Sequence, residues 1–369
     1  MTAALGVMTP SDYMARALFL AGRGRGRTSP NPLVGAVVVS SDGIVVGSGF
    51  HERAGEAHAE VRALESAGAL ARGSTLYCTL EPCCHVGRTG PCVVRIVEAG
   101  VARVVASVED PNPLVRGRGF TYLREHGVEV EVGLEAGTAV RLNAPFFTRL
   151  QHERPLVTLK AALSLDGCLA AAAGQRTALT SATANRHAHL FRAEVDAIAV
   201  GAGTILADDP MLTARGAYRA QPLVRVVFDR RLRTPSDARV LSTATSGPVI
   251  IVTSAEHVAG RDRARQALER CGARLLVTRT GRLREALQRL AADWQIGSLL
   301  LEGGAALHAA AWDEGVVDVV RLYVTPHVLG GDGVPFLPGG TFWSGALQDR
   351  RVEPLGPDVL IEGYVHRSR

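Results

Sequence analysis

Apolar positions in the first 150 residues switch between helical and strand spacing. Met14, Leu18 and Ala21 recur at the interval of an α-helix, whereas 34–39 is a continuous apolar run followed by a turn at 41–43. This mixture of a hairpin with later β-α-β units predicts a three-layer α/β domain. The expected helices cover 11–21, 58–67, 91–99 and 120–125, and the expected strands cover 34–39, 44–47, 75–80, 101–108 and 128–132.

The second half repeats strand and helix signals and is again α/β, without an obvious internal repeat. A polar stretch, Arg149–Arg154, stands before Pro155, so we expect domains at 1–150 and 151–369. The expected strands cover 156–162, 197–200, 224–228, 249–252, 275–277, 298–301 and 319–324, and the expected helices cover 182–194 and 283–293.

Composition is that of an ordinary globular chain. It has 369 residues, of which 47% are hydrophobic and 21% charged. No run reaches the ~18 apolar residues of a membrane span, and Met1–Thr9 does not resemble a signal peptide, so we expect a cytoplasmic protein without membrane contact. In that compartment the six cysteines are thiols or metal ligands.

Charge adds two observations. The net charge is +5, and Arg23, Arg25 and Arg27 alternate with glycine, a pattern that would suit nucleic acid or a solvated loop. We favour the loop and expect no nucleic-acid partner.

Lys160 is the single lysine among 41 basic residues and lies in an apolar strand, which indicates either chance survival or a need for an amine of tunable pKa. We favour the functional interpretation.

The main chemical signal is His58-Ala59-Glu60, followed by Glu81-Pro82-Cys83 and Pro91-Cys92. One His and two Cys supply three ligands to zinc and leave the fourth position for water, whose pKa zinc lowers. Glu60 is close enough to exchange protons with that water, as in zinc-dependent base deaminases. His58 and Cys92 each begin a predicted helix, where the helix dipole favours a thiolate.

The ligand set leaves one alternative open. Cys83 and Cys92 are nine residues apart, wider than the usual spacing, and Cys84 competes with Cys83. Adjacent residues rarely bind one zinc ion together, so we take one of the two and select Cys83. The other interpretation of the whole pattern is buried free thiols beside a surface histidine.

Two glycine motifs follow predicted strands in the second half. Gly201-Ala202-Gly203-Thr204 is too short to indicate a dinucleotide fold. Glu302-Gly303-Gly304, between a buried strand and a helix through Trp312, is a better candidate for binding phosphate on bare backbone amides. The alternative is a tight turn before a packed helix.

Several segments together closely resemble the bifunctional deaminase/reductase of riboflavin biosynthesis, over nearly the whole chain. The segments are Thr28–Val37, Gly49–His51 with Gly55, His58–Val61, Leu80–Cys83, Gly87–Thr89, Asp110–Pro113, Ser164–Gly167, Leu206–Pro210 and Glu302–Gly304.

This resemblance implies a cytidine-deaminase-like three-layer α/β/α domain, then an α/β domain similar to dihydrofolate reductase. The first would use zinc to deaminate 2,5-diamino-6-(5-phosphoribosylamino)pyrimidin-4-one. The second would use NADPH to reduce the ribosyl group, giving 5-amino-6-(5-phosphoribitylamino)uracil. The partner implied is therefore a phosphorylated pyrimidine, and members usually form homo-oligomers, here a dimer or tetramer.

The resemblance also implies roles for individual residues. It matches His58, Cys83 and Cys92 to zinc ligands and Glu60 to the proton shuttle. Lys160 and Asp208 are our candidates for handling the ribose during reduction. Pyrimidine-pocket positions are Asn31, His51 and His85, although a structural role remains open for both histidines. NADPH positions are Ala162, Thr204, Asp208, Arg230 (with Arg231, for the 2′-phosphate), Gly304, Ala305, Ala306, Leu307, His308, Ala309 and Ala310. Reductase substrate positions are Arg176, Arg192, Leu212, Arg215 and Glu302, and Arg192 with Arg215 would clamp a phosphate bidentately.

The chain departs from the family pattern after Gly174. The family usually has a small polar residue and then Trp, whereas this chain has Gln175-Arg176-Thr177-Ala178. An aromatic cofactor contact is missing and a cation enters a substrate position.

Two other hypotheses follow. The protein could deaminate another base and carry a degenerate reductase domain, or it could be a zinc-stabilised binding module. Glu60 argues against the second, since a structural zinc site needs no proton shuttle.

Overall fold

Two compact units divide the chain, Met1–His152 and Glu153–Arg369. The computed structural model describes residues 8–85, 90–219, 221–243, 246–340, 342, 345 and 347–365. The motif Gly87–Thr89 lies outside these described residues. Within them, no helix combines the length and the apolar character that a membrane crossing needs.

The first unit is built on a five-stranded sheet in the order β2-β1-β3-β4-β5. β1 is antiparallel to β2 and β3, whereas β3, β4 and β5 run parallel. The elements are α1 (Pro10–Gly22), β1 (Gly35–Val39), β2 (Val45–Phe50), α2 (Ala59–Ala67), the 3₁₀ turn η1 (Gly68–Ala71), β3 (Thr75–Cys78), α3 (Cys92–Glu98), β4 (Arg103–Ala106), α4 (Arg118–Glu125), β5 (Glu129–Val132), α5 (Ala136–Leu142) and α6 (Ala144–His152).

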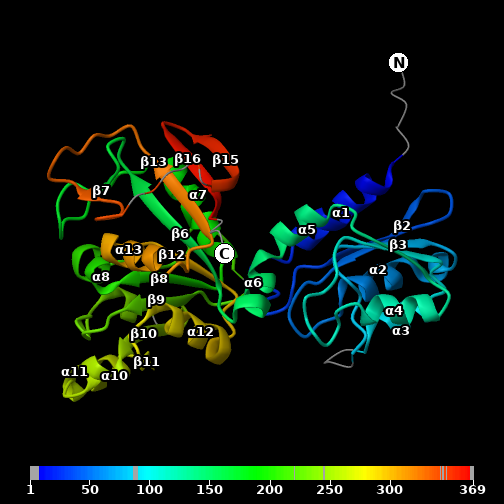
Figure 1. Cartoon of the computed structure of the whole chain (residues 1–369), viewed down its shortest axis with the longest axis horizontal. Coiled ribbons are helices and arrows are strands. Elements are labelled where there is room, and N and C mark those ends of the chain that lie inside the picture. Colours follow the sequence, from blue (N-terminus) through cyan, green and yellow to red (C-terminus); the bar gives the residue numbers. More distant parts are fainter. Residues whose placement is uncertain are drawn as a thin grey trace. The chain divides into compact units, whose positions relative to one another are not determined.

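Both faces of this sheet are buried, as the apolar run of β1 predicts. Val37 and Val39 pack on one side with α1 and α5, whereas Ala36 and Val38 pack on the other side with α2, α3 and α4. α1 approaches β1 so closely that a Cβ at Gly35 would lie 2.0 Å from the carbonyl oxygen of Ala17. The expected three-layer α/β/α arrangement is therefore present (Figure 1).

The second unit is built on a nine-stranded sheet in the order β11-β10-β9-β8-β12-β6-β13-β16-β15. The strands from β11 to β13 are parallel, and β16 and β15 add an antiparallel edge. The strands are β6 (Leu156–Leu163), β8 (Ala197–Gly201), β9 (Val224–Phe228), β10 (Val249–Ser254), β11 (Ala273–Thr278), β12 (Ser298–Leu301), β13 (Val319–Val324), β15 (Leu347–Leu355) and β16 (Asp358–Val365), with a separate ribbon of β7 (Cys168–Ala170) and β14 (Val334–Pro335).

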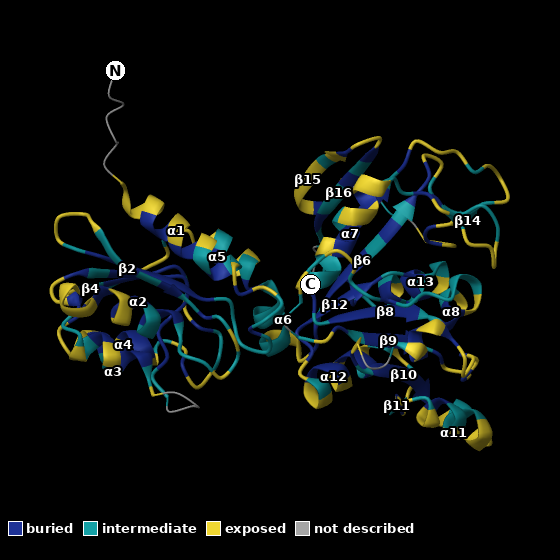
Figure 2. Ribbon diagram, turned by 180° about the vertical axis from the view of Figure 1, so that it is seen from behind, coloured by how far each residue is buried: buried dark blue, intermediate teal, exposed yellow. Residues whose placement is uncertain are grey.

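Helices cover both faces of this larger sheet. α12 and α13 pack on the face that carries Leu159 and Ala199, and α8, α9 and α11 pack on the face that carries Ile198 and Val200. Figure 2 shows the central strands as a buried layer. The helices are α7 (Ala182–Glu194), α8 (Ala202–Asp208), α9 (Arg239–Ser242), α10 (Ala255–Val258), α11 (Asp262–Arg270), α12 (Leu283–Trp294) and α13 (Ala305–Asp313).

The sequence predicted the central elements and missed the peripheral ones. α7 has the predicted bounds, and the predicted strands of the parallel sheet are all present. The pattern did not predict α5, α6, α8 to α11, the β7–β14 ribbon or the β15–β16 hairpin. These elements are short, polar or at an edge of the sheet.

Candidate deaminase and reductase sites

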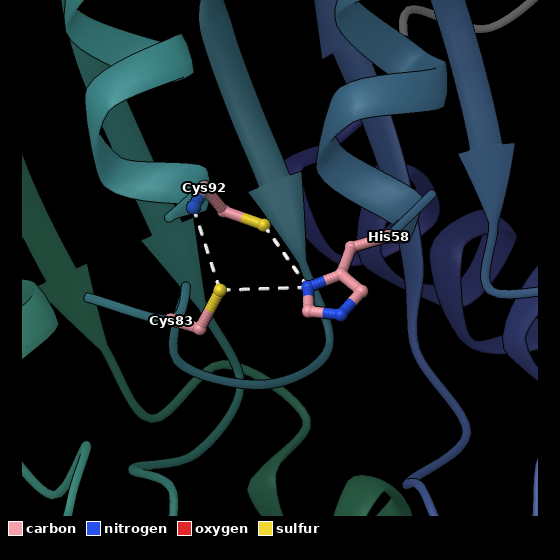
Figure 3. A group of neighbouring side chains, drawn as sticks. All are labelled: His58, Cys83 and Cys92. Atoms are coloured by element: carbon pink, nitrogen blue, oxygen red, sulfur yellow. Dashed lines mark hydrogen bonds between the residues drawn. The ribbon is translucent and has the colours of Figure 1, made fainter. Parts of the chain in front are cut away.

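His58, Cys83 and Cys92 converge in the first unit (Figure 3). The distance from His58 Nδ1 to Cys92 Sγ is 3.2 Å, and from His58 Nδ1 to Cys83 Sγ it is 3.4 Å. The ligand atoms of all three side chains lie within 4.8 Å of one another. They form the single such group of His, Cys, Asp or Glu side chains that a search of the described residues finds.

Local structure explains this convergence. His58 is the N-cap of α2, Cys92 is the first residue of α3, and Cys83 follows β3 in the intervening loop. The backbone N–H of Cys92 lies 3.4 Å from Cys83 Sγ and donates a hydrogen bond to it. Two helix N-termini therefore direct their positive ends at the same point, where they favour thiolates.

The donor set fits zinc. Zinc bonds of about 2.0 Å to nitrogen and 2.3 Å to sulfur place tetrahedral ligand atoms roughly 3.5 Å apart, close to the separations found here. Cys84 lies outside the group, with its Sγ 3.7 Å from the carbonyl oxygen of Leu114. Cys83, the ligand expected from the sequence, therefore lies with His58 and Cys92, whereas Cys84 lies apart from them.

Glu60 lies beside this group in the first turn of α2. It is 3% exposed, and its Oε2 atom has no hydrogen-bond partner among the residues that the structure describes. Burial raises the pKa of the Glu60 carboxyl to about 7, although the nearby His58 opposes the shift. A buried carboxyl group with one unpartnered oxygen and a pKa near neutrality suits a group that gains and loses a proton.

Two of the predicted pyrimidine-pocket residues, Asn31 and His51, lie beside the same group. Asn31 Nδ2 is 3.1 Å from His51 Nε2, and His51 Nδ1 is 3.3 Å from the carbonyl oxygen of Ala57. The His51 ring meets the His58 ring edge-on at 5.3 Å. The side chain of His85 carries a buried Nδ1 without a partner in the described part of the chain.

One buried carboxylate that the sequence analysis did not single out organises this loop region. Glu81 accepts hydrogen bonds from the backbone N–H groups of Asp110, Gly117, Gly119 and Phe120. It thereby joins the loop that carries Cys83 to the N-terminus of α4. The signal for this role in the sequence is the position of Glu81, two residues before Cys83.

The second unit contains a cleft of about 620 Å³ at the carboxyl ends of β6, β8 and β12. Parallel α/β sheets bind ligands at this edge. The predicted reductase residues that line the cleft are Lys160, Ala162, Arg176, Arg192, Thr204, Asp208, Leu212, Arg215, Glu302, Gly304, Ala305, Ala306, Leu307 and His308.

Lys160 and Glu302 face this cleft from neighbouring strands. Lys160 lies on β6, and Glu302 directly follows β12, which pairs with β6. Burial lowers the pKa of the Lys160 ammonium, while Glu302 opposes the shift. Burial alone would raise the pKa of Glu302, but the charges of Arg192 and Lys160 lower it to about 2. At the cleft, Glu302 is therefore a carboxylate, and Lys160 supplies an amine whose pKa is lowered.

Arg192 and Arg215, the expected phosphate clamp, each contact another residue of the protein. Arg192 donates from Nε to Glu302 Oε1 at 2.7 Å, from Nη2 to Oε2 at 2.5 Å, and from Nη1 to the Thr213 carbonyl at 3.0 Å. Glu302 therefore already occupies the fork of Arg192. Arg215 instead contacts His189, which lies one helical turn before Arg192 on α7. The i, i+3 spacing of His189 and Arg192 was the signal in the sequence for this cluster, which we did not predict.

Asp208 and Arg176 lie on the opposite part of the cleft. Burial raises the pKa of Asp208, and the charge of Arg176 opposes this shift. Arg176, at the point where the chain departs from the family pattern, therefore supplies a cation beside a partly buried acid. Leu212 lines the same cleft with a positive φ of 52°.

The predicted cofactor residues around α13 differ in where their side chains lie. The residues from Gly304 to His308, and Ala310, line the 620 Å³ cleft or the cavity next to it, but Ala309 lines neither and packs towards the core. A helix with 3.6 residues per turn cannot direct seven consecutive side chains at one ligand.

A second cavity of about 330 Å³ adjoins the cleft and shares Gly201, Gly203, Ala306 and Leu307 with it. Four arginines line this cavity, Arg230, Arg231, Arg233 and Arg282. The predicted Arg230 is thus one of a group of cations. A bare glycine backbone next to a cationic cavity fits a dinucleotide with an additional phosphate.

Comparisons with known proteins agree with this geometry. A family model described as the cytidine and deoxycytidylate deaminase zinc-binding region matches residues 8–108, and one described as the RibD C-terminal domain matches residues 155–361. Riboflavin biosynthesis protein RibD of Aquifex aeolicus is 40% identical over 95% of this chain and 97% of its own length. The Escherichia coli protein of that name is 41% identical over 96% of this chain and 99% of its own length.

Solved structures give the same result over the full length. Acinetobacter baumannii RibD has a TM-score of 0.85 at 36% identity and covers 97% of this chain and 99% of that one. A diaminohydroxyphosphoribosylaminopyrimidine deaminase/5-amino-6-(5-phosphoribosylamino)uracil reductase from Thermotoga maritima has a TM-score of 0.83 at 34% identity, covering 96% and 98%. With a deaminase zinc-binding region, a reductase domain and full-length similarity, the chain belongs to the family of bifunctional riboflavin biosynthesis deaminase/reductases.

Proposed function

We propose that this chain carries out two successive steps of riboflavin biosynthesis. Residues 1–150 hydrolyse the amino group of 2,5-diamino-6-(5-phosphoribosylamino)pyrimidin-4-one to release ammonia. Residues 151–369 then reduce the ribosyl group with NADPH, giving 5-amino-6-(5-phosphoribitylamino)uracil. The convergence of His58, Cys83 and Cys92 beside the buried carboxyl of Glu60, whose Oε2 atom has no partner among the described residues, is the observation that carries the proposal.

In the deaminase, His58, Cys83 and Cys92 would hold zinc, which when bound acidifies a water molecule. Glu60 would take one proton from the water and pass it to the ring nitrogen. It would then take the second proton from the hydroxyl group added to the ring carbon and pass it to the amine, which leaves as ammonia. Burial keeps this carboxyl close to a balance between its two protonation states at neutral pH. Asn31, His51 and His85 bind and orient the pyrimidine.

In the reductase, NADPH when bound supplies the hydride. The glycines before α13, with Ala162, Thr204 and the cleft-facing residues of α13, bind the cofactor, and Arg230 contacts its 2′-phosphate. Lys160 and Asp208 exchange protons with the ribose as it opens and is reduced. Arg176, Arg192, Leu212, Arg215 and Glu302 shape the substrate side of the cleft.

We further propose that the protein acts in the cytoplasm on this small molecule, as a homo-oligomer and without a nucleic-acid partner. All six cysteines are free thiols, and two of them would need to stay reduced to bind zinc. Light scattering would test the oligomeric state, and a monomer would contradict that part of the proposal.

One incubation tests the two reactions separately. The diaminopyrimidine substrate and NADPH are mixed with the protein, and ammonia release and NADPH oxidation are followed independently. The proposal predicts both. Ammonia release without NADPH oxidation would show an intact deaminase with a reductase domain that has lost or changed its task. This outcome is worth testing because the chain departs from the family pattern at Arg176 and Ala178.

A further inference from the structure

Lys160 and Tyr323 lie side by side on one face of the nine-stranded sheet. β13 pairs in parallel with β6, and Tyr323 is opposite Ala162, the second residue after Lys160. Because side chains alternate between the two faces of a strand, all three of these residues point to the same face. The Nζ atom of Lys160 lies over the Tyr323 ring, 5.5 Å from its centre, which is within the range of a cation–π contact.

The Lys160 ammonium has no hydrogen-bond or ion-pair partner in the part of the chain that the structure describes. The carboxylate on the neighbouring strand, Glu302, accepts hydrogen bonds from Arg192 at both of its oxygens. Burial therefore acts on an ammonium whose direct contact is an aromatic face. Such a face carries negative potential, so it favours the charged form of the amine over the neutral form.

The charged groups around this ammonium come from four elements and largely balance one another. Glu302 favours the ammonium and Arg192 on α7 disfavours it, and these two groups are paired with each other. His308 on α13 is uncharged near pH 7, because burial lowers its pKa to about 4. Arg321, which lies opposite the lysine in the β6–β13 pairing, forms an ion pair with Glu362 on β16. Each of these carboxylates is matched by an arginine, so the aromatic ring is an additional stabiliser of the ammonium.

The Tyr323 ring has a fixed orientation. It is fully buried and packs between α7 and the β15–β16 hairpin. Its hydroxyl group shares a hydrogen bond with Nδ1 of His187 at 3.0 Å. Burial raises the pKa of this hydroxyl to about 12, although the charge of Arg321 opposes the shift, so the ring is uncharged at neutral pH and well above it. The amine therefore meets a neutral aromatic face that packing and a hydrogen bond hold in place.

The proposed reduction needs a proton as well as a hydride. When the ribosyl group becomes ribityl, the bond between C1′ and the ring oxygen breaks. C1′ gains the hydride of NADPH, and the ring oxygen gains a proton. An ammonium can donate that proton, whereas a neutral amine is far too weak an acid to do so. Any group that keeps Lys160 charged despite its burial therefore supports the reaction.

We propose that Tyr323 is a positioning residue of the reductase, whose ring face holds the Lys160 ammonium at the cleft in its protonated form. This inference rests on the proposed function for the role of Lys160, but the contact itself can be tested without enzymatic activity. Lys160 is the single lysine of the chain. Protein labelled with ¹³C at the ε-carbon of lysine therefore gives one NMR signal from this position, and its chemical shift follows the loss of the proton.

The experiment is a pH titration of this signal in the full-length zinc-loaded protein. Tyr323→Phe keeps the ring and should leave the midpoint close to that of the unaltered protein. One, two or three fluorine atoms on the new phenylalanine ring weaken the negative potential of its face with little change in size. The midpoint should then fall in steps, by about one pH unit in total. The same fluorinated rings at Phe336, which contacts His308 and Phe342, are the matched control and should not shift it.

The rate of NADPH oxidation with 5-amino-6-(5-phosphoribosylamino)uracil separates the contact from its role in the reaction. The decline of this rate at alkaline pH should move to lower pH in the same steps as the NMR midpoint. A midpoint that stays constant across the fluorinated series would overturn the contact and the proposal with it. A midpoint that falls while the rate profile stays the same would show that the ammonium is not the proton donor, so Tyr323 would not serve the reaction. If the unaltered protein oxidises no NADPH at any pH while the midpoint falls, the contact is confirmed, but the proposed function is wrong and so is the reductase role of Tyr323.

Discussion

Glu60 lies two residues after His58, on the helix that begins at the metal group. Glu60→Gln keeps the size of the side chain but removes its capacity to take a proton. We expect zinc content to stay the same and ammonia release to fall by about 10³-fold, within the range of general acid–base contributions. Metal analysis and an ammonia assay check this. Glu65→Gln, an exposed position on the same helix, is the matched control, and equal activity of both variants would exclude the shuttle.

Lys160 is a second test at the residue scale. Its amine lies 5.5 Å from the centre of the Tyr323 ring, and its pKa is lowered by burial. Lys160→Ala should leave ammonia release unchanged and slow NADPH oxidation by at least about 10²-fold, since proton transfer in the reductase would be lost. The two assays are run on the same sample. Slower ammonia release with normal NADPH oxidation would reverse the assignment of domains.

Residue types and their spacing predicted a large part of the site and missed what depends on packing. The rule that neighbours seldom share a metal limited the ligand to either Cys83 or Cys84, and the selected Cys83 is the one that lies with His58 and Cys92. The partner of Arg192 could not be predicted, because Glu302 is 110 residues away and reaches it only through the β12–α7 arrangement. The side chain of Ala309 lines neither cavity, because consecutive residues of a helix face different directions.

At the scale of elements, Glu81 connects the metal loop to α4. Its carboxylate accepts four backbone N–H groups, and a Cβ at Gly119 would lie 2.2 Å from the carbonyl oxygen of Pro82, so the packing is close. Glu81→Gln places an NH₂ group among these donors. We expect the first unit to lose about 2–4 kcal/mol, since each buried donor left unpaired costs 1–3 kcal/mol. Thermal melting checks this, with Glu109→Gln, at an exposed position in the loop between β4 and α4, as control. Similar melting of both variants would refute it.

The Arg192–Glu302 pair joins α7 to the segment between β12 and α13. The pKa of Glu302 in the folded protein, about 2, lies below its ordinary value of 4.5. The stabilisation is therefore fully present above about pH 4.5 and is lost as the pH falls towards 2. By pH 3 the second unit should lose about 2 kcal/mol from this group. Melting from pH 5 to 3 should show a steeper decline than in Glu302→Gln, with exposed Glu269→Gln as control. Parallel declines in all three proteins would contradict this.

Edge and surface elements escaped prediction for physical reasons. β15 carries a mostly exposed polar sequence, as expected of a strand at the end of a sheet, and so lacks the apolar run that identified β8 or β12. α11 is almost entirely polar with one buried residue, Leu268. α6 continues to His152 through the polar segment that had indicated a linker. Periodicity identifies elements that are buried, and these elements bury little.

For the whole molecule, the central question is whether the two sites act in sequence. Each unit has its own core and its own site. Removing zinc with dipicolinate should therefore abolish ammonia release without preventing the reductase unit from working. Because reduction follows deamination in the proposed order, NADPH oxidation on the diaminopyrimidine should stop as well.

Supplying the deaminated intermediate, 5-amino-6-(5-phosphoribosylamino)uracil, to the chelated protein should restore NADPH oxidation to at least about half its original rate. Zinc added back should restore ammonia release, since the three ligands would rebind it. NADPH oxidation that persists on the diaminopyrimidine without zinc would mean that the reductase accepts the substrate before deamination, and the order of the two reactions would have to be reversed. Failure of the intermediate to restore oxidation would instead show that the reductase unit depends on the zinc of the other unit.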